Sequence, residues 1–158
     1  MPIQKPEHLS NFYCQNNRIK VKVSKLYVGY AKGENINYTN VKNTIHYKFA
    51  SSELKLVGDL DKEYNDYHLN TGHDTNSVSY RRLIRVISED GYNSKDYPIL
   101  VYRSLSRPYP IKRWDVIDGF HRLAILSALG VEEVEVVVCK YKYKNKIKQI
   151  FQNIIYGI

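Results

Sequence analysis

Residues 118–122, Asp-Gly-Phe-His-Arg, place a carboxylate, an imidazole and a guanidinium within one short segment. An apolar run precedes the segment and apolar residues at helical spacing follow it, so we predict a buried strand, a turn at Asp118-Gly119 and a helix. His121 and Arg122 would then lie in the first helical turn, where the helix dipole disfavours cations by roughly 0.3–1 kcal/mol. A bound anion offsets this cost, because both side chains and the first-turn N–H groups can hydrogen-bond to it. The pattern therefore predicts a phosphate-binding turn.

Each of these side chains has a chemical interpretation and a structural alternative. Arg122 is suited to bidentate binding of phosphate, or it forms an ion pair with Asp118 or Asp115. His121 either contacts a phosphate oxygen and acts as an acid or base near neutral pH, or bonds a nearby carbonyl group. Asp118 either holds Mg²⁺ or accepts a proton from a substrate hydroxyl, or only forms the turn. Gly119 would let the backbone approach the anion closely.

A second group of reactive side chains occupies the polar segment 61–77. These residues are Asp61, Glu63, Asp66, His68, His73 and Asp74. His73 and Asp74 are expected in a loop that precedes a helix starting after Thr75. The loop either caps that helix or forms the opposite wall of a cleft. In the second case, His73 and Asp74 contribute a substrate contact or a proton acceptor and are further catalytic candidates.

The elements that position these residues alternate between strand and helix patterns. Helices are expected after Thr75 and Gly119, and each ends at a glycine, Gly91 or Gly130. The expected strands of this half are residues 98–103, 114–117 and 131–139. We therefore predict an α/β (α+β) fold with a small mixed sheet, in which ligands bind beyond the carboxyl ends of strands.

The remaining segments give weaker patterns. We expect an irregular arm at residues 1–17, a strand or hairpin arm at residues 19–30 and a turn-rich stretch at residues 29–43. A short strand is expected at residues 45–49, and residues 54–60 form either a strand or a helix. Residues 145–158 have apolar side chains at helical spacing. We expect a C-terminal amphipathic helix there, which packs on the sheet or on a second subunit of a homodimer.

Length and composition indicate one domain over residues 1–158. A hydrophobic content of 43% is typical of a globular chain rather than a disordered one. Cys14 and Cys139 lack metal-ligand spacing, and two thiols without a framework fit the reducing cytoplasm. No segment predicts a membrane span or a signal peptide.

The net charge of +8 is concentrated near the C-terminus. The lysines there are Lys140, Lys142, Lys144, Lys146 and Lys148. Alternating with Tyr141 and Tyr143, they either follow a nucleic-acid backbone or form a solvated strand edge that discourages pairing between sheets.

The segment from Tyr80 to Lys140 resembles the ParB/sulfiredoxin-like fold, through strand–Asp-Gly-x-His-Arg–helix–Gly followed by a Val-rich strand. That fold includes chromosome-partition nucleotide-binding domains, sulfiredoxins and free serine kinases. Sulfiredoxins carry a reactive cysteine where this chain has Phe120, so their activity is not expected. Few residues follow Gly130, so we expect no centromere-binding clamp. The resemblance to the kinases implies a catalytic role for Asp118 and phosphate binding by His121 and Arg122.

The leading hypothesis is a Mg²⁺-dependent, kinase-like phosphotransferase that binds ATP or another nucleotide through residues Gly119, Phe120, His121 and Arg122. A small-molecule hydroxyl would be the acceptor. The first alternative is a DNA-binding or nuclease protein of the same family, which would use the Lys140–Lys148 segment. The second alternative is a nucleotide sensor without catalytic activity.

Overall fold

The computed structural model describes residues 11–32, 35–71, 75–103 and 114–142. The strands are β1 (Phe12–Lys22), β2 (Leu26–Lys32), β3 (Asn35–Asn40), β4 (Ile99–Tyr102), β5 (Trp114–Asp118) and β6 (Glu133–Tyr141). The α-helices are α1 (Ile45–Lys55), α2 (Asp61–Thr71), α3 (Ser77–Asp90) and α4 (Phe120–Ala128). Two short 3₁₀ helices, η2 (Val23–Lys25) and η3 (Val41–Asn43), precede β2 and α1.

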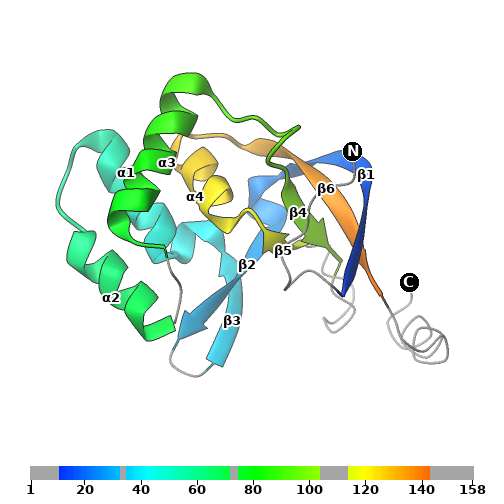
Figure 1. Cartoon of the computed structure of the whole chain (residues 1–158), viewed down its shortest axis with the longest axis horizontal. Helices are drawn as coiled ribbons and strands as arrows, with labels where there is room; N and C mark the ends of the chain where they lie inside the picture. Colours follow the sequence, from blue (N-terminus) through cyan, green and yellow to red (C-terminus); the bar gives the residue numbers. More distant parts are fainter. Residues whose placement is uncertain (1–10, 33–34, 72–74, 104–113, 143–158) are drawn as a thin grey trace.

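The six strands form one mixed sheet in the order β1-β6-β4-β5-β2-β3. The β4·β6 and β2·β5 pairs are parallel, whereas β1·β6, β4·β5 and β2·β3 are antiparallel. The helices gather on one side of the sheet (Figure 1). The predicted mixed α/β (α+β) class, with helices after Thr75 and Gly119, is confirmed.

The strands β4 and β6 have buried side chains on both faces, as their continuous apolar runs predict. On β6, Val136 belongs to the main core beneath the helices, while Val137 packs in a smaller cluster with Leu100. The helices complete the main core with large, fully buried aromatic side chains: Phe49, Tyr64 and Tyr80. The sheet and helix layers thus hold β5 and α4, which carry the predicted turn, in fixed positions.

The first helices were not predicted from the sequence. Residues 45–49 are the start of α1 rather than a strand, because Thr44 caps the helix by accepting a hydrogen bond from the Tyr47 N–H. Ile45 and Phe49 then share one helix face and are both buried. The stretch 54–60 is no separate element: α1 ends at Lys55, and Leu56 adopts a left-handed conformation. Much of the polar segment 61–77 is helical as well, as α2.

The N-terminal expectations also need correction. The described part of the expected arm is a strand, because β1 begins at Phe12 and pairs with β6. β1 and β2 do not pair as a hairpin: η2 separates them, and β2 pairs instead with β3 and β5. The turn-rich stretch 29–43 contains β3.

Cys14 and Cys139 form a disulfide, so the expectation of two free thiols is wrong. The two residues lie directly opposite each other on the antiparallel strands β1 and β6, with 4.2 Å between their Cα atoms. Because 125 positions separate them in the sequence, only the strand register reveals the pairing. The cysteines therefore give no support to a reducing compartment.

Within the part of the chain that the structure describes, no helix is both long and apolar enough to cross a membrane. The predicted C-terminal helix at 145–158 and residues 1–10 of the expected arm lie outside the described residues, as does the proposed homodimer contact through that helix.

Candidate functional site: the β5–α4 turn and a three-histidine cluster

The turn between β5 and α4 has the predicted form. The strand ends at Asp118, Gly119 adopts a left-handed conformation with φ of 92°, and the helix begins at Phe120. A Cβ atom at Gly119 would lie 3.0 Å from the Cα of Ile99 and 3.3 Å from Nη2 of Arg122. Both the backbone conformation and the close packing therefore require glycine at this position.

Arg122 and Asp118 form an ion pair, with 3.0 Å between Nη2 and Oδ2. The Arg122 side chain is 17% exposed and the Asp118 side chain 34% exposed, so the pair is half-buried rather than fully solvated. The structural alternative for Arg122 is thus present in the structure. It uses only one hydrogen-bonding direction of the guanidinium, which has five N–H donors. The other N–H groups can donate to an entering anion.

His121 points toward α2 rather than along its own helix. Its Nε2 lies 3.1 Å from the hydroxyl oxygen of Tyr64, which is a fully buried residue of α2. Burial raises the pKa of the Tyr64 phenol, so its hydroxyl remains protonated across the physiological range. The contact holds the His121 ring against the helix layer and brings it next to two further histidines.

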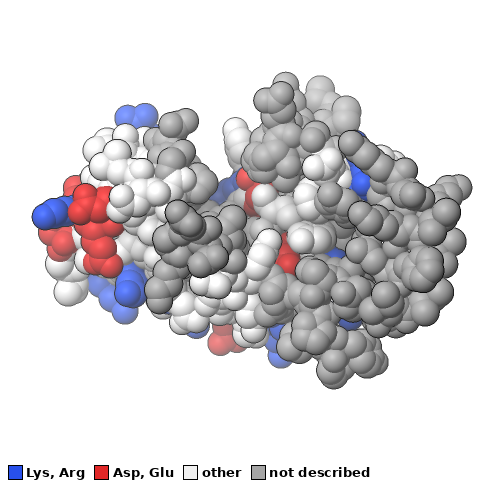
Figure 2. Space-filling view, turned by 90° about the horizontal axis from the view of Figure 1, so that it is seen from below, with Lys and Arg blue, Asp and Glu red and all other residues white. Residues whose placement is uncertain are grey.

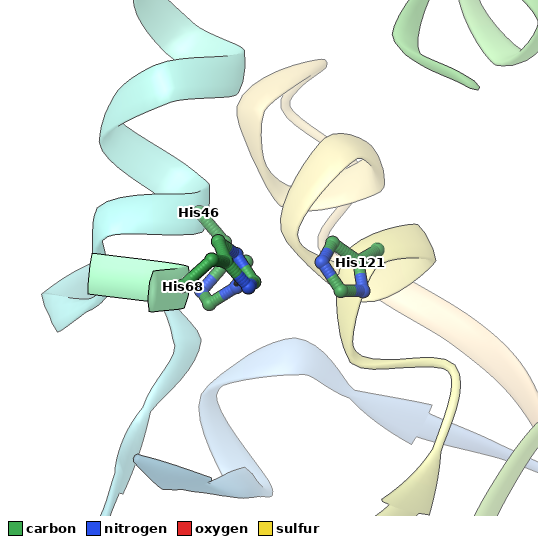
Figure 3. Close-up of side chains that lie close together, drawn as sticks. All are labelled: His46, His68 and His121. Carbon is green, nitrogen blue, oxygen red and sulfur yellow. Dashed lines mark hydrogen bonds between the residues drawn. The ribbon is translucent and has the colours of Figure 1, made fainter. Parts of the chain in front are cut away.

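These further histidines are His46, in the first turn of α1, and His68, in the last turn of α2. Their Nε2 atoms are 3.1 Å apart, and the residues are only 2% and 3% exposed. One ring nitrogen from each of His46, His68 and His121 lies within 4.8 Å of the other two. Figure 3 shows the His121 ring projecting from α4 toward the paired rings of the other two.

Neither partner of His121 in this cluster was recognised as a site residue from the sequence. Residues 45–49 were expected to form a strand, and His68 was counted only among the side chains of a polar segment. Recognising α1 and α2 as helices would have placed both histidines at helix ends. The approach of these ends to α4 depends on helix packing.

A cavity of about 760 Å³ connects the predicted turn with the histidine cluster. Its wall includes residues of the turn, all three histidines and aromatic residues: Asp118, Arg122, His46, His68, His121, Tyr67 and Tyr80. In the space-filling view, acidic and basic side chains are visible among uncharged ones in the middle of one face (Figure 2). The cavity offers both charged groups and ring faces, as binding pockets for small polar molecules do.

Of the other predicted site residues, Gly119 and Phe120 line the cavity. His73 and Asp74 lie outside the described residues, although their neighbour Thr75 lines the cavity. The Asp118 carboxylate, the expected Mg²⁺ ligand, accepts a hydrogen bond from the Arg122 guanidinium. The one group of potential metal ligands found among the described residues is the histidine cluster.

The proposed nucleic-acid segment is described only as far as Lys142. Lys140 and Lys142 are exposed at the end of β6, and the rest of Lys140–Lys148 lies outside the described residues.

Compared with known protein families, curated proteins and solved structures, the chain matches none.

Proposed function

We propose that the protein is a nucleotide-binding phosphotransferase of the ParB/sulfiredoxin-like fold that transfers a phosphoryl group to a small-molecule hydroxyl. The observation that carries the proposal is the β5–α4 turn. Gly119 and Arg122 lie at the N-terminus of α4, and both line a cavity of about 760 Å³. A helix N-terminus and a forked guanidinium are both suited to phosphate oxygens.

The Arg122–Asp118 ion pair fits this proposal as the resting state of the site. Without a ligand, Asp118 neutralises the positive charge of the Arg122 guanidinium. A bound phosphate would neutralise that charge instead. The carboxylate is then released for its proposed role, which is to hold Mg²⁺ or to accept the proton of the acceptor hydroxyl. The hydroxyl oxygen would attack the terminal phosphorus, and the bond to the leaving phosphate oxygen would break. Positioning and charge stabilisation supply most of the catalysis in such reactions.

The aromatic wall of the cavity supports a nucleotide rather than inorganic phosphate as the ligand. The half-buried rings of Tyr67 and Phe120 line the cavity together with the turn. Ring faces of this kind can stack on a base, which contributes roughly 1–3 kcal/mol per base in single-stranded nucleic-acid complexes. The polar end of the cavity would hold the phosphates and the aromatic wall the base or ribose.

Calorimetric titration with ATP, ADP and CTP, with and without Mg²⁺, tests the binding step. Truncating Arg122 removes a charged hydrogen bond worth about 1.5–3 kcal/mol, so Arg122→Ala should weaken binding about ten- to hundredfold. Arg82→Ala is the matched control, because Arg82 is an exposed residue of α3. Equal affinity in wild type and Arg122→Ala would contradict the proposed site.

Asp118→Asn separates binding from catalysis. The substitution removes the anionic competitor for the guanidinium, so nucleotide affinity should stay the same or increase. Turnover should fall, because the amide is neither a base nor a charged Mg²⁺ ligand. Turnover is measured with γ-labelled nucleotide and pooled hydroxyl-containing metabolites. Binding without labelled product in the wild type would instead support a nucleotide sensor. Binding to DNA that weakens steeply with added salt would support the nucleic-acid alternative.

A further inference from the structure

We propose that His46, His68 and His121 form a site for one divalent transition-metal ion, Zn²⁺ being the first choice, with one coordination position open to the cavity. Its ligands do not include Arg122 or Asp118, the charged residues of the proposed phosphate site. It assigns to His121 a metal-binding role in place of the phosphate contact expected from the sequence.

The positions of the ring nitrogens support this proposal. Two imidazole ligands of a tetrahedral Zn²⁺, each about 2.05 Å from the metal, have their nitrogens about 3.3 Å apart. The Nε2 atoms of His46 and His68 are separated by 3.1 Å, which is close to that spacing. All three ligand atoms fall within 4.8 Å of one another. The third ring must therefore move toward the other two by at most about 1.5 Å, which a side-chain rotation can supply.

The three ligands come from three different helices, and each lies at a helix end. His46 lies in the first turn of α1, His68 in the last turn of α2 and His121 in the first turn of α4. The α1, α2 and α4 helices pack together over the sheet, so the helix layer fixes the ligand backbone positions before any metal binds. Such a site on rigid elements loses little conformational entropy on binding.

The surroundings favour a metal with nitrogen ligands and an accessible face. His46 and His68 are almost fully buried, whereas His121 is half-buried, and all three line the cavity. Three protein ligands with a fourth position facing a cavity are typical of catalytic zinc sites rather than closed structural ones. Imidazole suits Zn²⁺, Co²⁺, Ni²⁺ or Fe²⁺, whereas Mg²⁺ takes oxygen ligands.

Aromatic residues enclose the cluster and supply a hydrogen-bonding group at its edge. The His46 ring makes edge contacts with the rings of Tyr64 and Tyr67 at centroid distances of 5.4 and 5.5 Å. The Tyr64 hydroxyl lies 3.1 Å from His121 Nε2 and can orient that ring. Because His121 and Arg122 both line the cavity, the open position of the metal is suited to water or to an oxygen of a phosphate held by Arg122.

The test is a titration of the untagged, EDTA-treated full chain with ZnCl₂. Nucleotide is left out, so the result does not depend on whether the phosphate-binding proposal is correct. We expect one Zn²⁺ per chain. Substitution of Co²⁺ should give the intense visible bands of a four- or five-coordinate ion, and X-ray absorption should show three imidazole nitrogens. The disulfide-bonded cysteines should contribute no sulfur ligand.

Variants identify the ligands. His121→Gln and His68→Gln should weaken Zn²⁺ binding by more than the 10- to 100-fold that loss of an outer hydrogen-bond partner typically causes. Glu89→Gln changes an exposed carboxylate of α3 outside the cluster and should leave binding unchanged. No Zn²⁺ binding by the wild type, or binding unaffected by His121→Gln, would overturn the proposal. The wild-type spectra keep the test decisive even where a buried variant fails to fold.

Discussion

Replacing Gly119 with alanine tests whether the site depends on the close packing of its backbone. A residue other than glycine in the left-handed region costs roughly 1–2 kcal/mol. At Gly119 the new Cβ would also lie 3.0 Å from the Cα of Ile99 and 3.0 Å from its Cγ1. Because the Cα belongs to the buried strand β4, relief requires movement of the backbone, and overpacking of this kind typically costs 1–3 kcal/mol. We therefore expect a total loss of about 2–5 kcal/mol in the free energy of unfolding.

Gly130→Ala and Gly58→Ala are the matched controls. Both glycines also have positive φ, 83° and 79°, but a Cβ at Gly130 would meet no atom within 4 Å, and one at Gly58 would meet only the Ser52 Oγ, at 3.7 Å. They should lose only the conformational cost of about 1–2 kcal/mol. Urea denaturation measures all three variants, and nucleotide titration of folded Gly119→Ala should show weakened binding. Equal destabilisation by Gly119→Ala and the controls would refute the close approach of the turn to β4.

Two further outcomes concern stability. Cys14→Ser should lower the free energy of unfolding by about 5 kcal/mol, because the Cys14–Cys139 disulfide closes a loop of 125 positions and so restricts the unfolded chain. Urea denaturation under oxidising conditions measures this loss. A loss below about 1 kcal/mol would contradict the cross-link. Burial raises the pKa of Tyr64 and Tyr80 above the usual value near 10, so both stay protonated in the folded state while the unfolded chain ionises. The stability that they contribute is therefore fully present below pH 10 and is lost as pH rises further, by up to about 1.4 kcal/mol per pH unit for each group. Tyr64→Phe should make this alkaline loss shallower, whereas the exposed control Tyr97→Phe should not; the same pH dependence in both variants would contradict this expectation.

The turn could be predicted from the sequence because its signals are local. The strand before Asp118, the glycine at the turn and the helix ending near Gly130 each depend on a few consecutive residues, and the structure has all three. The same holds for α3, which Asn76 caps by accepting a hydrogen bond from the Ser79 N–H and which stops at Gly91.

Residues 45–71 were misjudged because their helices carry weak hydrophobic patterns. The buried residues of α2 are Tyr64 and His68, which differ from the aliphatic stripe of an ordinary amphipathic helix. Signals for its start were nevertheless present: the Asp59 side chain accepts a hydrogen bond from the Asp61 N–H, and acidic residues occupy the first turn. The disulfide and the histidine cluster join segments far apart in the sequence, so they depend on strand register and helix packing.

The central claim is that the β5–α4 turn binds the phosphates of a nucleotide, and an NMR titration of the isotope-labelled protein with ATP tests it most directly. We expect the largest chemical-shift changes at the amide groups of residues 119–123 and at the Arg122 side chain, with smaller changes around the aromatic wall of the cavity. Shifts confined to the exposed lysines at the end of β6, with the turn unaffected, would contradict it.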